Sequence, residues 1–467
     1  MHRKVLKMGI LLSLLAHLSC TTDQVEMQSA GFTSWAATPP MGWNSWDCYG
    51  PTVTEAEVKA NADYMAEHLL SYGWQYIVVD IRWYVENTKS RGYNQTDPRF
   101  VMDEYGRFLP AVNRFPSAEG GKGFKPLADY VHGKGLKFGV HMMRGIPVVA
   151  VKNDTPILGS AATASQIYSE DLQCKWLRDM YTIDATKDGA QSYYDSIFKQ
   201  YAEWGVDYVK VDNISRPYHK AEIEMIRKAI DKCGRPIVLS LSPGATPVDQ
   251  ASHVVQHANL WRISDDFWDR WQDIEEQFAR CKAWAPHIGD GTWPDADMLP
   301  LGRIGIRAER GDERRTRLTQ DEQVTLMTLW AIFRSPLMFG GDLPSNDAFT
   351  LALITNPEVL AVNQNSNGNR EFFNRAGHIG WIADAPDAPD KYIALFSTND
   401  ADSASSPITD KIVLQFDEAG LTGTYTIRDL WAQKNLGSFE NSFTSDIAFH
   451  GAGLYRVSPA TDNSGIH

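Results

Sequence analysis

The chain has 467 residues, enough for one large hydrophobic core and a smaller one, because single cores rarely grow beyond about 250–300 residues. Its formal charge is −13 at pH 7 and no region is densely basic, which excludes the phosphate-binding surface of a nucleic-acid-binding protein. The 15 tryptophans could supply platforms for flat, amphipathic ligands, although most tryptophans in any protein belong to its core.

Residues 1–20 are typical of an export signal. Three basic residues precede an apolar run, 8–18, that is too short to span a bilayer. The small residue before Cys20 resembles a bacterial lipoprotein cleavage site, at which Cys20 becomes the lipidated first residue; an ordinary secretory signal is the alternative. In both cases we expect an exported protein, periplasmic or anchored to the outer membrane through a lipid on Cys20, with residues 21–36 as a tether.

Between residues 37 and 365, short apolar strands alternate with amphipathic helices, which predicts an α/β fold of the (β/α)8 TIM-barrel type. Capping boxes, Thr54 with Glu57 and Thr319 with Glu322, mark the starts of two helices. Further helices are expected at 123–134, 195–204, 219–233, 275–285 and 347–361. The expected strands are 41–46, 76–80, 137–141, 208–212, 236–242, 260–264, 293–299 and 336–340.

One connection in this barrel is unusually long. Residues 142–194 follow the third strand and are polar with scattered apolar residues. Loops of this length are usually functional or disordered. Because TIM-barrel active sites lie at the C-terminal ends of the strands, we expect this segment beside the site.

Beyond residue 366 the pattern changes to strands with a period of two, separated by Gly, Pro, Asp and Ser turns. This predicts a C-terminal antiparallel β-sandwich over residues 366–460. The segment carries no obvious chemistry, so an accessory or stabilising role is expected, with carbohydrate binding as the alternative.

Carboxylates stand at the ends of four expected strands. Polar residues at these positions of a TIM barrel point into the active site. The alternation of side chains puts Lys210 and Asp212 on one face of strand four, and it puts Arg262, Ser264 and Asp266 on one face of strand six, with Asp265 pointing away. The set comprises Asp80 in strand two, Asp212 in strand four, Asp265 and Asp266 after strand six, and Asp295 and Asp297 in strand seven.

Such a set suits glycoside hydrolysis, which needs one ionised and one protonated carboxyl group. Lys210 favours the anionic form of Asp212, as a nucleophile requires, and Asp266 is the candidate general acid. The alternative is a metal site of Asp and His at the barrel mouth, but no histidine spacing supports one. His141, at the end of strand three, is expected to contact sugar or to be structural.

Several motifs, in this order along the chain, resemble glycoside hydrolase family 27, the α-galactosidase family, whose members have a barrel followed by a C-terminal β domain. The resemblance covers nearly all of residues 38–460. The motifs are TPPMGWNSWDCYG (38–50), YIVVD (76–80), YVKVDN (208–213), LWRISDD (260–266), PDADML (294–299) and SPLMFGGDL (335–343).

The resemblance implies a retaining mechanism in which Asp212 is the nucleophile and Asp266 the acid/base, with no cofactor or metal. It also implies a sugar-binding set. Lys210 and Arg262 would hold hydroxyls, Trp46 would lie under the ring, Asp80 would bind hydroxyls on the galacto-configured side, and Asp297 would line the outer pocket. Ser242, at the end of strand five, and His141 complete the candidates.

The sequence departs from the family pattern at two informative positions. Ile214 replaces a cysteine found in many members, so their disulfide is absent, and the four cysteines after the signal match no metal motif. Ile81 stands where α-galactosidases of the family have a second aspartate, which contacts the 6-hydroxyl. β-L-Arabinopyranose is α-D-galactopyranose without its C6 hydroxymethyl group, and an isoleucine would cover the bare C5.

We therefore expect an exo-glycosidase that acts on oligo- or polysaccharides with terminal β-L-arabinopyranosyl residues. The first alternative is an α-galactosidase for terminal α-D-galactosyl residues, with Ile81 against the barrel wall and a neighbour such as Arg82 reaching O6. A non-catalytic sugar-binding protein of the envelope is the second alternative, and the presence of both Asp212 and Asp266 argues against it.

Overall fold

The computed structural model describes residues 31–92, 94–386, 388–400 and 409–460. The expected signal, its Cys20 and residues 21–30 of the expected tether lie outside the described residues. The end of that tether differs from the expectation, because Phe32–Ala36 form a 3-10 helix. The Ala36 carbonyl accepts a hydrogen bond of 2.8 Å from the Trp293 indole, so this helix is attached to the base of the barrel.

The predicted barrel is confirmed. Its parallel strands follow one another in the order β10-β9-β8-β7-β3-β2-β1-β13. Leu299 forms a parallel bridge with Phe339 of β13, which joins the two edges of the sheet into a ring. The strands are β1 (Met41–Asn44), β2 (Tyr76–Val79), β3 (Lys137–Met143), β7 (Tyr208–Asp212), β8 (Val238–Leu241), β9 (Leu260–Arg262), β10 (Trp293–Asp295) and β13 (Leu337–Phe339).

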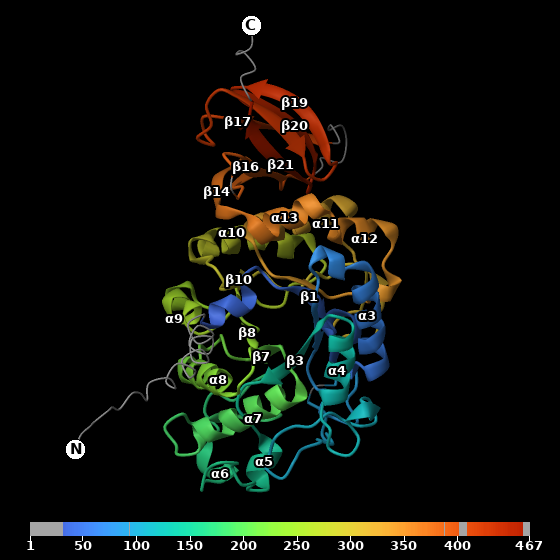
Figure 1. The fold of residues 1–467 in the computed structure, drawn as a ribbon, viewed down its shortest axis with the longest axis vertical. Helices are drawn as coiled ribbons and strands as arrows, with labels where there is room; N and C mark the ends of the chain where they lie inside the picture. Colours follow the sequence, from blue (N-terminus) through green and yellow to red (C-terminus); the bar gives the residue numbers. More distant parts are fainter. Residues whose placement is uncertain (1–30, 93, 387, 401–408, 461–467) are drawn as a thin grey trace, which may run out of the picture.

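Helices surround this ring, with two more after β13 (Figure 1). Both predicted capping boxes form at the starts of α3 and α11. The segment expected as one helix at 347–361 is two helices, because Asn356 and Pro357 start a second one. The helices are α2 (Trp46–Tyr49), α3 (Glu55–His68), α4 (Lys125–Gly133), α7 (Ala190–Trp204), α8 (Lys220–Lys232), α9 (Ala251–Val255), α10 (Trp271–Trp284), α11 (Gln320–Phe333), α12 (Ala348–Ile354) and α13 (Pro357–Asn365).

The long connection after β3 is a compact insertion. Three short strands in the order β4-β6-β5 form its sheet. Gly145 approaches the Tyr181 carbonyl so closely that a Cβ at Gly145 would lie 2.1 Å from that oxygen, at a φ of 95° that favours glycine. Its elements are β4 (Ile146–Pro147), α5 (Val148–Lys152), α6 (Ala164–Ile167), β5 (Tyr168–Ser169) and β6 (Met180–Ile183). A smaller hairpin, β11 (Arg303–Ile304) with β12 (Arg314–Arg315), follows β10.

The C-terminal domain is antiparallel, as predicted. A six-stranded sheet, ordered β14-β15-β16-β21-β18-β19, shares a hydrophobic core with the separate pair β17-β20. The sequence pattern missed β14, β19 and β20, whose residues are largely polar. The strands are β14 (Asn367–Arg375), β15 (His378–Asp384), β16 (Lys391–Ser397), β17 (Thr409–Gln415), β18 (Thr424–Asp429), β19 (Lys434–Glu440), β20 (Ser442–Ala448) and β21 (Ala452–Pro459).

Helix α11 lies between the barrel and the C-terminal domain, and residues 325–333 of it are buried on all sides. A helix that is apolar all round is expected in such a position. Thr328 accepts a hydrogen bond of 2.8 Å from the Trp431 indole, and Phe333 packs edge-on against Trp381 of β15. The two domains thus share one hydrophobic core. No helix in the described ranges is long and apolar enough to cross a membrane.

Candidate active site

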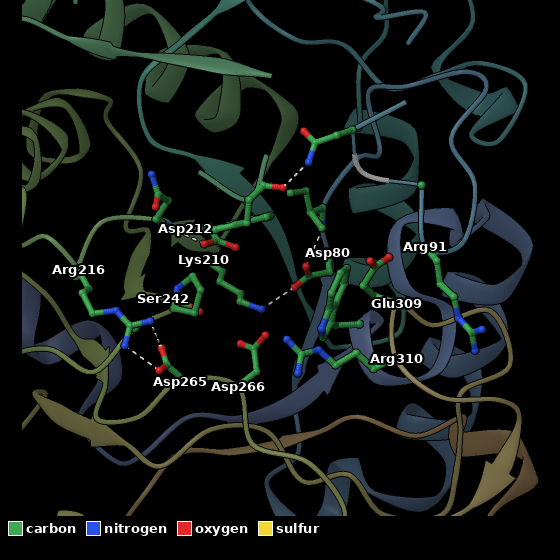
Figure 2. Close-up of a pocket in the computed structure, with 18 of the residues that line it drawn as sticks. Asp80, Arg91, Lys210, Asp212, Arg216, Ser242, Asp265, Asp266, Glu309 and Arg310 are labelled. Carbon is green, nitrogen blue, oxygen red and sulfur yellow. Dashed lines mark hydrogen bonds and ion pairs between the residues drawn. The ribbon is translucent and has the colours of Figure 1, made fainter. Parts of the chain in front are cut away.

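A cavity of about 1080 Å³ opens at the C-terminal ends of the barrel strands (Figure 2). The alternation of side chains along the strands explains why charged residues line this cavity. On β7, Tyr208 packs inside the base of the barrel, and Lys210 and Asp212 follow it on the same face toward the mouth. Apolar residues therefore fill the base of the ring, and charged residues line its mouth. Of the predicted site residues, the cavity is lined by Trp46, Asp80, Ile81, Lys210, Asp212, Ser242 and Asp266.

Asp80 and Lys210 form a buried ion pair on the cavity wall. Lys210 Nζ and Asn44 Nδ2 each lie 2.8 Å from Asp80 Oδ2, and the Ile81 backbone N–H donates to Asp80 Oδ1. Burial raises the pKa of Asp80, but Lys210, His141 and these hydrogen bonds outweigh it, so the pKa falls to about 2. Asp80 is therefore an ionised acceptor for hydroxyl groups throughout the usual pH range.

Asp212 is held in one orientation by two donors. His141 Nε2 lies 2.8 Å from Asp212 Oδ2, and the Asn213 backbone N–H donates to Asp212 Oδ1. His141 is fully buried and does not line the cavity. Of the two roles expected for His141, the structure favours the structural one, because this side chain reaches the carboxylate and not the open space.

Asp266 points into the same cavity from the segment after β9 (Figure 2). Its carboxylate lies 3.6 Å from Arg262 Nη2. Arg262 itself is buried, donates to the Asp265 carbonyl and pairs with Asp297 at 2.6 Å. Arg262 is not among the residues that line the cavity and supports Asp265 and Asp266 there, so its expected contact with sugar hydroxyls stays a prediction.

Asp297 differs from its expected place, because it is buried behind Arg262 instead of lining the outer pocket. It accepts a hydrogen bond of 2.7 Å from the Phe267 backbone N–H. Burial, together with the nearby Asp266 and Asp295, raises the pKa of Asp297 to about 7, although the Arg262 guanidinium opposes the shift. Asp297 thus fixes the segment that carries Asp266.

The side-chain directions predicted from strand alternation are wrong just after β9, because the strand ends at Arg262. Beyond that residue the chain turns, so Ser264 points into the protein interior and accepts from Gln277 Nε2 at 2.9 Å. Asp265, expected to point away, lines the cavity and pairs with Arg216 at 2.6 Å. Only Asp266 lies where the predicted face placed it.

Ile81 lines the cavity next to Asp80 and is 1% exposed. Its side chain belongs to an apolar cluster with residues of the insertion. Arg82 takes a left-handed conformation, φ 67°, and points away into a fully buried pair with Asp179 of the insertion, at 3.0 Å. Arg82 therefore does not supply a polar group in place of Ile81. The cluster consists of Ile81, Met143, Cys174, Leu177 and Met180, with Trp46 and Trp176 packed against it.

Several lining residues were not predicted. They come from the long connections after β2 and β3 and from the segments after β7, β8, β9 and β10, where sequence gives the length of a loop but not its path. For Arg91, Gly92, Asn94 and Gln95, the length of the connection 80–124, which is nearly that of the insertion, is a sequence signal of a segment beside the site. The lining residues that were not predicted are Arg91, Gly92, Asn94, Gln95, Trp176, Asn213, Arg216, Pro243, Gly244, Asp265, Arg270, Glu309 and Arg310.

The TIM barrel, the carboxylate-lined cavity at its mouth and the attached β-sandwich together fit a glycoside hydrolase. Residues 152–365 match the sequence model of alpha galactosidase A, and residues 381–457 match that of the alpha galactosidase C-terminal beta sandwich domain. The chain belongs to glycoside hydrolase family 27, as its 51% identity to a solved member of that family over 93% of its length also shows.

Relatives of this chain are named for different sugar specificities, among them β-L-arabinopyranosidase, alpha-galactosidase and, for a 50% identical structure from Bacillus halodurans, putative alpha-N-acetylgalactosaminidase. The crystal structure of a β-L-arabinopyranosidase of family 27 from Geobacillus stearothermophilus, in complex with arabinose, is 51% identical and superposes with a TM-score of 0.89 over 93% of this chain and 100% of that one. Alpha-galactosidase 2 of Arabidopsis thaliana is 28% identical over 90% of both chains. Alpha-galactosidase A of Cellvibrio japonicus is 28% identical over 78% of this chain and 76% of its own.

Proposed function

We propose that this protein is a retaining exo-glycosidase that removes terminal β-L-arabinopyranosyl residues from oligo- or polysaccharides. One observation carries the choice of sugar: Ile81 lines the cavity beside Asp80. In the proposed complex, its side chain covers the C5 edge of the bound pyranose. The 51% identity to a β-L-arabinopyranosidase supports the same choice.

In the proposed reaction, Asp80 and Lys210 bind hydroxyl groups and Trp46 lies under the ring. An oxygen of Asp212 attacks the anomeric carbon while Asp266 gives its proton to the leaving oxygen, which forms a glycosyl-enzyme ester. Asp266 then takes a proton from water, the water oxygen attacks the same carbon, and Asp212 leaves as a carboxylate. This requires a separation of about 5–5.5 Å between the two carboxyl groups.

The discrimination against galactose follows from the apolar cluster around Ile81. A galactoside would place its 6-hydroxyl against Ile81 without a partner in that cluster. Leaving a hydroxyl unpaired and losing a bond to a charged acceptor costs about 1.5–3 kcal/mol, which is roughly ten- to a hundredfold in kcat/KM.

The test compares kcat/KM for nitrophenyl β-L-arabinopyranoside and nitrophenyl α-D-galactopyranoside. We expect the wild type to favour the arabinoside and Ile81→Asp to shift the ratio toward the galactoside by at least tenfold. Ile81→Val is the matched control, because it keeps the wall apolar and should keep the preference. Equal preference in the wild type, or an unchanged ratio in Ile81→Asp, would contradict the proposal.

An α-galactosidase remains the second candidate, because the curated relatives at 28% identity carry that name. A wild type that prefers the galactoside would favour it. Turnover of either glycoside would exclude the non-catalytic sugar-binding protein.

We also propose that the protein is exported and carries a lipid on Cys20. The support is the sequence pattern of residues 1–20 alone. Labelling with a radioactive fatty acid in a Gram-negative host should mark the wild type and not Cys20→Ala, while both should leave the cytoplasm. Cytoplasmic retention of the wild type would exclude export.

A further inference from the structure

Helices α8 and α9 lie on the outside of the barrel (Figure 1). Outside the cavity, two histidines at α9 and a glutamate of α8 form a cluster. Glu224 belongs to the second turn of α8, His253 to α9, and His257 follows two residues after that helix ends. One ring nitrogen of each histidine and a carboxylate oxygen of Glu224 lie within 4.8 Å of one another. The three side chains are half-buried, so an ion could reach them from solvent.

Hydrogen bonds on the far side of each ring fix which nitrogen faces the cluster. His257 Nδ1 lies 2.7 Å from the His253 carbonyl oxygen. A carbonyl oxygen only accepts, so Nδ1 of His257 carries the proton and Nε2 keeps its lone pair. His253 Nδ1 lies 2.6 Å from the Tyr218 hydroxyl, which leaves Nε2 facing Glu224. A histidine that binds a metal usually has such an oxygen partner on its other nitrogen.

The spacing of two of these groups fits a tetrahedral site. His253 Nε2 lies 3.3 Å from Glu224 Oε1. Metal–ligand bonds of about 2.0–2.1 Å place neighbouring ligands of a tetrahedron roughly 3.3–3.4 Å apart. His257 is stacked on His253, with ring centroids 4.1 Å apart. A movement of its ring nitrogen by at most about 1.5 Å completes three corners of this tetrahedron.

We infer that Glu224, His253 and His257 form a binding site for a divalent transition metal, zinc in particular, with the fourth position open to water. Two imidazoles and one carboxylate suit zinc, whereas calcium and magnesium prefer oxygen ligands alone. The sequence signal is the spacing of four between His253 and His257, which brings both rings to one side of a helical turn.

The site would fasten α9 to α8 and would not take part in glycoside cleavage. Tyr218, which contacts His253, is two residues from Arg216 on the cavity wall. Zinc should therefore stabilise this side of the barrel while kcat changes little. This inference stands apart from the proposed function, since it concerns metal binding and not the choice of sugar.

The test uses the full-length protein, stripped of metal with a chelator that is then removed, and titrated with zinc chloride by calorimetry and by thermal melting. We expect one zinc ion per chain with micromolar or tighter affinity and a rise in Tm of several degrees, with no such rise in magnesium chloride. The cobalt-substituted protein should show the visible absorption of a tetrahedral site.

Variants locate the site. His257→Ala and Glu224→Gln should each weaken zinc binding at least tenfold and remove the rise in Tm. If His257→Ala folds poorly, Glu224→Gln still tests the site, because its side chain keeps a group that can bond to His253. His68→Ala, which removes an exposed histidine elsewhere, should bind zinc as the wild type does. Absence of stoichiometric binding by the wild type, or unchanged binding in Glu224→Gln, would overturn the inference.

Discussion

The imidazole of His141 lies 2.8 Å from the carboxylate of Asp212, and no part of this histidine reaches the cavity. The two residues are 71 positions apart in the chain and face each other across neighbouring strands, β3 and β7, which pair His141 with Lys210. The His141 imidazole, which lies outside the cavity, thus holds one oxygen of the proposed nucleophile Asp212. The carboxylate can turn only by giving up a buried hydrogen bond.

Substitution of His141 should therefore lower kcat and leave KM nearly unchanged. His141→Leu removes the donor to Asp212, and loss of a hydrogen bond to a charged group, about 1.5–3 kcal/mol, corresponds to roughly a ten- to hundredfold fall in kcat. His141→Gln retains a donor and should lose less. Steady-state kinetics on a nitrophenyl glycoside distinguish the two variants, and a rise in KM without a change in kcat would contradict a positioning role.

Replacement of the two proposed catalytic carboxylates should have different effects. Asp212→Gly should lose at least about 10³-fold in kcat, and added azide should restore turnover with a glycosyl azide of inverted configuration. Asp266→Ala should still cleave substrates with strongly acidic leaving groups, and azide should give a product of retained configuration. NMR of the azide products checks both assignments, and the reverse configurations would exchange the two roles.

The buried pair of Arg82 and Asp179 should be important for stability. Asp179→Ala leaves the Arg82 guanidinium in the interior without its carboxylate, which should reduce the free energy of unfolding by about 3–5 kcal/mol. Urea denaturation followed by tryptophan fluorescence measures this change. Asp312→Ala removes an exposed pair with Arg91 and is the control, for which no measurable change is expected. Equal stability of the two variants would contradict the prediction.

Stability should fall on acidification because of His219. Burial, reinforced by the Arg144 guanidinium, lowers the pKa of His219 to about 3, whereas an unfolded histidine titrates near 6.5. Below pH 6.5 the unfolded chain therefore binds a proton that the folded protein does not, and the cost reaches about 2 kcal/mol at pH 5.

His219→Gln should remove this part of the pH dependence. Urea denaturation at pH 7.5 and pH 5 should show a smaller loss of stability in His219→Gln than in the wild type or in the exposed control His68→Gln. An identical loss in all three proteins would show that His219 does not contribute.

The architecture could be predicted from sequence because parallel strands buried on both faces read as short apolar runs. All eight barrel strands and both capping boxes were found in this way. The missed strand β19 shows the converse, since its residues are nearly all exposed and carry no hydrophobic period. The split between α12 and α13 depends on the cap at Asn356 and the following Pro357, a pair that is typical of a helix start.

The site was predictable where it depends on strand alternation and not where it depends on loops. Asp80, Lys210 and Asp212 sit on or directly after regular strands, and they line the cavity as expected. Arg262 and Asp297 lie one layer deeper than predicted, because sequence cannot show which charged residues pair with each other behind a wall. The contact of Arg82 with Asp179 joins residues 97 positions apart, and no local pattern encodes it.

Because Arg82 pairs with Asp179, the polar attachment of the insertion and the lining of the cavity depend on different side chains. Arg82 and Tyr84 both bond to Asp179 of the insertion, so this polar attachment does not depend on position 81, which contributes an apolar side chain to the cavity and to the cluster. An ancestral barrel could therefore exchange the residue at 81 and keep this polar attachment. Divergence of sugar preference within such a lineage would leave almost no trace in the backbone, and only the chemistry of one side chain would record it.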